Sequence, residues 1–128
     1  MIYLDSSVVL ARLLTEPRTA PDMTWNDVLV SSRLLEYEVW NRIHAHQLTQ
    51  LLGETTQRLL EHVVLLDLSR TVVARAIDPF PVAVRTLDAL HLASIEYLRR
   101  EGQPVRLATY DRRMIACARA LDIALYEL

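Results

Sequence analysis

Short apolar runs and longer segments of helical periodicity alternate along the whole chain. We predict strands from the apolar runs at residues 1–4, 28–30, 63–68, 106–109 and 123–126. We predict helices at residues 8–14, 34–47, 49–62, 71–77, 86–100 and from 111 onward. The unbroken 63–68 run is typical of a strand covered on both faces. The alternation predicts an α/β fold in three layers, a parallel sheet of four to five strands with helices on both faces.

The composition is that of one globular domain spanning residues 1–128. Hydrophobic residues make up 52% of the chain and charged residues 23%, which excludes a disordered chain. The single cysteine, Cys117, excludes an internal disulfide and is typical of a reducing compartment. No run reaches the roughly 18 apolar residues of a membrane span, and no secretory leader is evident. We therefore expect a cytoplasmic protein that makes no membrane contact.

Asp88 lies in a predicted helix that is apolar nearly all round. On a helix it shares a face with Val84, Leu92 and Ile95, and the opposite face is also largely apolar. A carboxylate on a buried face is costly unless it is paired, hydrogen-bonded or bound to a cation. Asp88 therefore indicates a site that holds positive charge.

Other acids follow the ends of predicted strands. Asp5 ends the first strand, Asp111 lies just past the strand at 106–109, and Glu36 and Glu38 lie on the helix after the second strand. Because the carboxyl ends of parallel strands meet at one rim of the sheet, we expect these acids to converge with Asp88. Oxygen-only ligands favour Mg²⁺ or Mn²⁺ over zinc.

Each acid also has a purely structural interpretation. Asp5, Asp88 and Asp111 each stand where an acid caps or stabilises a helix N-terminus. Glu38 alone would be an ordinary solvated helix residue. Only the joint pattern, four acids from four separate segments, favours a common metal site over these alternatives.

Four segments together resemble the PIN-domain nucleases, and most closely the VapC toxins of bacterial toxin–antitoxin pairs. They are Ile-Tyr-Leu-Asp-Ser-Ser at 2–7, residues 32–39, Arg-Thr-Leu-Asp-Ala-Leu-His-Leu-Ala at 85–93, and Ala-Thr-Tyr-Asp-Arg-Arg at 108–113. The last two are the most specific. Their order and spacing cover nearly the whole chain.

The resemblance implies a Mg²⁺-dependent endoribonuclease that acts as the toxin of a toxin–antitoxin pair. It implies a homodimer and a cognate VapB-type antitoxin that blocks the acidic pocket. The metal ligands and catalytic acids of the family fall on Asp5, Asp88, Asp111 and one glutamate. That glutamate is Glu38 by its spacing from Ser32, with Glu36 as the alternative because Ser31 precedes it by five residues.

Neighbouring polar residues acquire roles through the same resemblance. Ser6 and Thr109 would orient the carboxylates by hydrogen bonds. Some relatives carry another acid two residues after the position of Asp111, where this chain has Arg113. That departure argues against a second tightly held metal and leaves Arg112 or Arg113 free to contact a substrate phosphate.

Other functions fit the residues less well. A receiver-like signalling domain needs a lysine near its aspartate, and all 14 basic residues of this chain are arginine. A catalytically weak PIN-fold protein that acts only as a binding partner stays an alternative. We expect His91 to be a packed or hydrogen-bonded histidine, because a hard-cation site has no need of imidazole.

Overall fold

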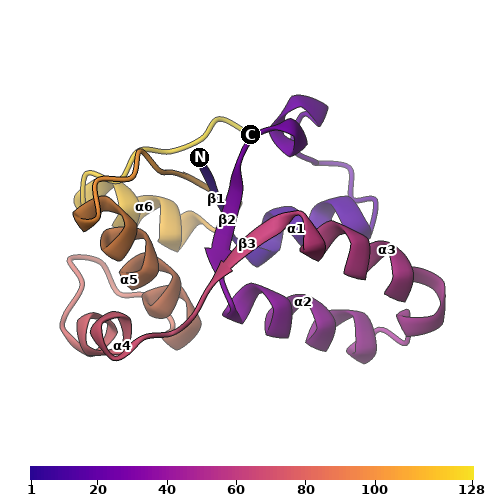
Figure 1. Cartoon of the computed structure of the whole chain (residues 1–128), viewed down its shortest axis with the longest axis horizontal. Helices are drawn as coiled ribbons and strands as arrows, with labels where there is room; N and C mark the ends of the chain where they lie inside the picture. The colour runs from indigo at the N-terminus through magenta and orange to yellow at the C-terminus, as the bar shows by residue number, and fades with distance from the viewer.

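The computed structural model describes all residues 1–128 and has a four-stranded parallel sheet at its centre (Figure 1). The strand order is β3-β2-β1-β4. The strands are β1 (Ile2–Leu4), β2 (Leu29–Ser32), β3 (Val63–Leu66) and β4 (Arg106–Ala108). The chain winds outward from β1 to β3 and then crosses to β4 on the other side of β1. The strand order therefore reverses between β1 and β4, where ligand sites of open α/β sheets lie.

Helices cover both faces of this sheet, as the sequence predicts. One side carries α1 (Ser6–Leu13), α2 (Leu34–Ala45) and α3 (Thr49–Glu61), and the other carries α4 (Arg70–Ile77), α5 (Thr86–Arg100) and α6 (Arg112–Ala120) (Figure 1). A short 3₁₀ helix, η1 (Asp22–Asn26), precedes β2. No helix is both long enough and apolar enough to cross a bilayer.

Alternate residues of each central strand supply two separate cores. Ile2 and Leu4 of β1 pack with α1, α2 and α3, whereas Tyr3 points to the opposite face and packs with α5 and α6. Successive side chains of a strand point to opposite faces, so a strand that is apolar at every position is buried on both. The continuous apolar run at the start of the chain thus places β1 in the middle of the sheet.

Two predicted strands differ from the observed ones. β3 is an edge strand, and Val64 is 58% exposed, so the prediction of a strand covered on both faces is wrong for this run. An apolar run reports hydrophobicity and does not specify which neighbours will cover it. The predicted strand at 123–126 is reduced to a single parallel bridge between Leu107 and Leu125.

Side-chain caps set the start of three helices. Asp5 accepts a hydrogen bond from the Ser7 N–H, so α1 begins at Ser6, two residues earlier than predicted. Ser69 caps α4, as predicted, and Asp111 caps α6. Two of these caps are also acids at the rim of the sheet, so helix initiation and the placement of carboxylates share the same residues.

Candidate functional site

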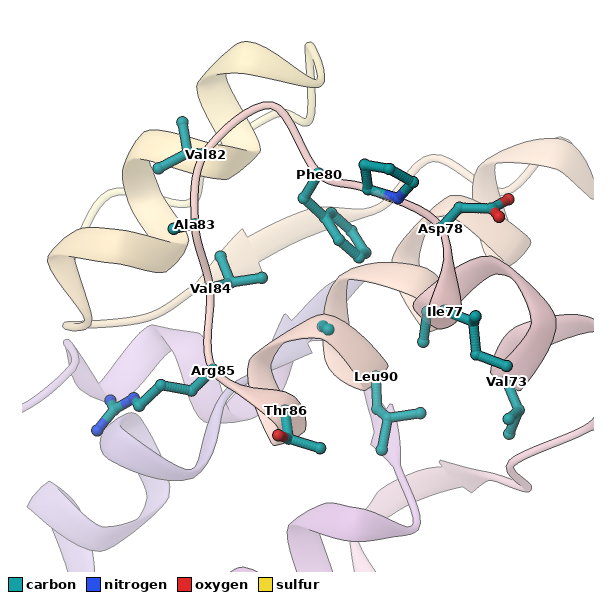
Figure 2. Close-up of a pocket in the computed structure, with 13 residues that line it drawn as sticks. Val73, Ile77, Asp78, Phe80, Val82, Ala83, Val84, Arg85, Thr86 and Leu90 are labelled. Carbon is teal, nitrogen blue, oxygen red and sulfur yellow. The ribbon is translucent and has the colours of Figure 1, made fainter.

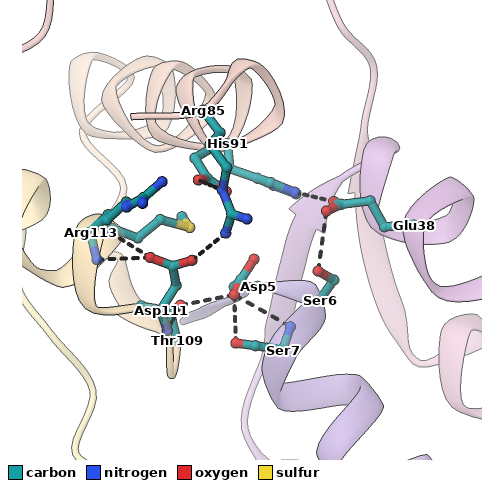
Figure 3. A network of polar contacts seen from close by, with 11 residues as sticks. Asp5, Ser6, Ser7, Glu38, Arg85, His91, Thr109, Asp111 and Arg113 are labelled. Atoms are coloured by element: carbon teal, nitrogen blue, oxygen red, sulfur yellow. Dashed lines mark hydrogen bonds and ion pairs between the residues drawn. The ribbon is translucent and has the colours of Figure 1, made fainter. Parts of the chain in front are cut away.

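Four carboxylates line one cavity of about 770 Å³ beyond the carboxyl ends of β1 and β4. Asp5 follows β1, Glu38 lies on α2, Asp88 lies in the first turn of α5, and Asp111 is the N-cap of α6. Figure 3 shows Asp5, Glu38 and Asp111 directed toward a common space. The sequence prediction that these four segments converge is the arrangement observed.

Asp5 is held by one of its two oxygens. Its Oδ2 accepts hydrogen bonds from the Ser7 N–H, the Ser7 hydroxyl and the Thr109 hydroxyl, the last at 2.8 Å (Figure 3). Its Oδ1 accepts none, although the side chain as a whole is buried. Three donors therefore fix the carboxylate while one oxygen stays available to a ligand.

Thr109 connects two of the acids. Its hydroxyl donates to Asp5 and accepts from the Asp111 N–H at 3.0 Å. The contact arises because Thr109 directly follows β4, which pairs with β1 immediately before Asp5. Thr109 therefore fixes the positions of Asp5 and Asp111 relative to each other.

Asp88 is only 8% exposed, and its one polar partner is Arg85, whose Nε lies 3.4 Å from Oδ2. Burial raises the pKa of Asp88, and the negative charges of Asp111 and Asp5 raise it further. Arg85 opposes these effects without cancelling them. The prediction that Asp88 is a buried acid with a need for positive charge agrees with this environment.

Arg85 bridges two acids, because its Nη2 also donates to Asp111 Oδ2 at 2.7 Å. The other oxygen of Asp111 accepts the Arg113 and Met114 N–H groups at 2.8 and 3.1 Å. Burial alone would raise the pKa of Asp111, but these helix N–H groups and Arg85 outweigh it, and the pKa is lowered. The pKa values of Asp88 and Asp111 are therefore shifted in opposite directions, although both carboxylates contact the same arginine.

Glu38 is held between two elements. Its Oε2 accepts the Ser6 hydroxyl at 3.1 Å, and its Oε1 contacts His91 Nε2 (Figure 3). Glu36 instead lines a different cavity with Arg33 and Trp40. Of the two glutamates that the sequence left open, only Glu38 lies in the acidic cavity.

His91 is fully buried and links Glu38 to the core of the sheet. Its Nδ1 lies 2.8 Å from the hydroxyl of Tyr3, which also accepts the Ser32 N–H at 3.0 Å. Because a carboxylate only accepts hydrogen bonds, Nε2 must carry a proton toward Glu38. Burial lowers the pKa of His91, but the hydrogen bond and charge of Glu38 outweigh it and raise the pKa. His91 is hydrogen-bonded, as expected, and its partner is one of the four acids.

The basic residues of the cavity are Arg18, Arg42 and Arg85. Arg112 and Arg113, which the sequence suggested as phosphate contacts, do not line it, and Arg113 contributes only its backbone N–H to Asp111. The spacing of Arg85, three residues before Asp88, is a signal that sequence reasoning missed, since residues three apart share a helix face. Nothing in the sequence indicates that Arg18 or Arg42 would join them.

Arg85 separates the acidic cavity from an apolar one of about 630 Å³. Figure 2 shows Phe80, Ile77 and Leu90 around that apolar cavity, with the Arg85 side chain extending away from them. The segment 78–85 thus directs Phe80 and Val84 toward the apolar cavity and the Arg85 guanidinium toward the acids.

The carboxylate oxygens of the four acids are the type of ligand that a hard divalent cation such as Mg²⁺ or Mn²⁺ prefers. Burial first, and then the negative charges of Asp111 and Asp5, raise the pKa of Asp88, so a bound cation would favour its ionised form. In this conformation, however, no three His, Cys, Asp or Glu side chains are arranged to hold one ion. The Arg85 guanidinium supplies the positive charge between Asp88 and Asp111.

Comparison with known proteins agrees with the observed fold. The PIN domain family model matches residues 2–125. Ribonuclease VapC47 of Mycobacterium tuberculosis (strain CDC 1551 / Oshkosh) is 30% identical over 126 residues, covering 93% of this chain and 90% of the relative. Ribonuclease VapC46 of Mycobacterium tuberculosis (strain ATCC 25618 / H37Rv) is 33% identical over 130 residues, covering 96% and 94%. The chain therefore belongs to the PIN domain family and is similar in particular to its VapC-type ribonucleases.

Proposed function

We propose that this protein is a metal-dependent endoribonuclease and the toxin of a type II toxin–antitoxin pair. The observation that carries the proposal is the convergence of Asp5, Glu38, Asp88 and Asp111 on one cavity at the switch point of the sheet. The names of two relatives similar over nearly the whole chain, both VapC ribonucleases, support the same activity.

In this proposal Asp5, Asp88 and Asp111 bind Mg²⁺ or Mn²⁺, and Glu38 binds it directly or through water. The bound ion would supply a Lewis acid that activates water and neutralises charge on the phosphodiester. Ser6 orients Glu38, and Thr109 orients Asp5, by the hydrogen bonds that these hydroxyls donate. Oδ1 of Asp5 is the oxygen left free for the ion.

Arg85 has two successive roles in this scheme. Without the ion it neutralises Asp88 and Asp111, which would otherwise repel each other. With a divalent ion bound by these acids, the exposed Arg85 guanidinium would be free to donate to a substrate phosphate. Metal binding and the availability of this phosphate ligand are therefore coupled.

The proposed partners follow from the VapC class of the relatives. They are an RNA substrate, a VapB-type antitoxin that covers the acidic cavity, and a second copy of the chain in a homodimer. We propose that residues 1–128 act as a single PIN domain in the cytoplasm. Co-expression with the gene adjacent to this one, followed by co-purification, tests the antitoxin assignment.

Cleavage of labelled RNA in Mg²⁺, and then in EDTA, tests the activity. Asp88→Asn should lower the cleavage rate by more than the roughly 100-fold typical of losing an outer-shell partner. The matched control is Asp67→Asn, because Asp67 is exposed, follows β3 and pairs only with Arg33. Full cleavage by the Asp88 variant, or by the wild type in EDTA, would refute the proposal. If the wild-type protein forms an antitoxin complex but cleaves no RNA, the protein acts as a binding partner and not as an enzyme.

A further inference from the structure

A second cavity of about 510 Å³ adjoins the acidic one. Arg18 and Tyr110 line both, so they form the wall between the two. Beyond this wall the second cavity contains Arg112, Arg119 and Tyr126, with Glu127 as its one side-chain carboxylate. The acidic cavity therefore has four carboxylates and three arginines, whereas the second cavity has three arginines and one side-chain carboxylate, with Arg18 shared between the two.

The arginines of the second cavity have no acidic partner in the protein. Six arginines elsewhere or at the acidic cavity form ion pairs: Arg12, Arg33, Arg58, Arg75, Arg85 and Arg106. Arg18, Arg112 and Arg119 are in none of these pairs and make no side-chain hydrogen bond to the protein. Their guanidinium donors are therefore available to an anionic ligand.

Arg18 is nevertheless held in place. Its guanidinium carbon lies 4.0 Å from the ring centroid of Tyr110, a cation–π contact. Stacking uses the face of the guanidinium and leaves its N–H donors free in the plane. The buried Tyr110 hydroxyl also has no hydrogen-bond partner in the protein. The wall between the cavities thus combines an oriented cation with an unsatisfied polar group.

From these features we infer that the second cavity binds the stretch of single-stranded RNA next to the cleaved phosphodiester, with Arg18, Arg112 and Arg119 contacting its phosphates. The inference rests on the proposed ribonuclease function and adds to it the path of the substrate. A polynucleotide repelled by four carboxylates needs cations at the neighbouring phosphates. Exposed bases also stack on aromatic rings, and the Tyr126 ring lines this cavity, with the Arg106 guanidinium carbon 4.9 Å from its centroid. The combination of arginine and tyrosine therefore favours RNA over an acidic peptide.

Salt-dependent RNA binding tests this subsite. Fluorescence anisotropy of a labelled single-stranded oligoribonucleotide would be measured in Ca²⁺ buffer over a range of salt concentrations. For single strands, each phosphate contact contributes about 0.7 to the slope of log affinity against log salt. Arg18→Gln and Arg112→Gln should each weaken binding about tenfold at low salt and reduce that slope by about 0.7.

Arg100→Gln is the matched control, because Arg100 is exposed, unpaired and at the end of α5 opposite Asp88. All three variants change exposed residues and should melt within about 2 °C of the wild type. The inference is overturned if Arg18→Gln and Arg112→Gln keep the wild-type affinity and slope, or if Arg100→Gln loses as much affinity as they do. A wild type that shows no Mg²⁺-dependent cleavage would overturn the proposed function itself, so the two failures are distinguishable.

Discussion

Removing the Tyr3 hydroxyl should destabilise the protein strongly, because this one group is the hydrogen-bond partner of two buried polar groups. The Tyr3→Phe variant keeps the ring in the core but leaves the Ser32 N–H and His91 Nδ1 without the partner they have at 3.0 and 2.8 Å. Both groups are fully buried, so water cannot replace the hydroxyl. A buried polar group left unpaired costs about 1–3 kcal/mol, and two such groups give a loss of about 3 kcal/mol.

That loss corresponds to a fall in melting temperature of roughly 10 °C for a domain of this size. Denaturant unfolding and thermal melts of Tyr3→Phe would be compared with Tyr37→Phe, because Tyr37 is 63% exposed and has no hydrogen bond. The control should lie within about 0.5 kcal/mol of the wild type. Equal stability of the two variants would refute the reasoning, because the buried chain from Ser32 through Tyr3 to His91 would then contribute nothing.

Three further perturbations concern the acids and Arg85. Asp88→Asn should raise the free energy of unfolding by about 1 kcal/mol at neutral pH. Because the pKa of Asp88 is raised in the folded state, wild-type stability falls as pH increases from 3.8 through the raised value. Denaturation measured over a range of pH should therefore show that the advantage of Asp88→Asn over the wild type disappears in acid. Asp111→Ala should cost about 1 kcal/mol through loss of the α6 cap, whereas Asp111→Asn keeps the cap; a thermal melt separates them, and equal melting would contradict the capping role. Since the pKa of Asp111 is lowered, its charge stabilises the fold above 3.8 and ceases to do so as pH falls through the folded value. Arg85→Gln should bind Mn²⁺ about threefold to tenfold more tightly in calorimetry, with Arg100→Gln as the unchanged control; weaker binding would show that Arg85 does not compete with the ion.

The layered fold follows from local sequence pattern. Periodicity and capping residues are properties of neighbouring positions, and they correctly predict α5 from Thr86 to Arg100 and the start of α4 after Ser69. Burial of a strand depends on which element lies beside it. The prediction that the apolar run of β3 is covered on both faces is therefore wrong, because β3 is an edge strand and Val64 is exposed.

The convergence of the four acids was also predictable, because parallel strands deliver their following residues to one rim. Helical periodicity alone did not separate Glu38 from Glu36, because the choice depends on how α2 is rotated against the sheet. The preference for Glu38 came from its spacing after Ser32 in the family resemblance, and Glu38 is the one that lines the acidic cavity. The rotation of α2 is set by the burial of Leu35, Val39 and Ile43 against α1 and β1. It directs Glu38 toward Ser6 and His91.

The sequence by itself determined the element order, the acids and their common rim, because these follow from hydrophobic period and strand direction. Only the tertiary structure decided the partners of those acids: Arg85 across Asp88 and Asp111, His91 against Glu38, and Arg18 stacked on Tyr110. Such contacts join residues from separate segments through the angles at which helices pack. Those angles result from the whole core, and no short stretch of sequence encodes them.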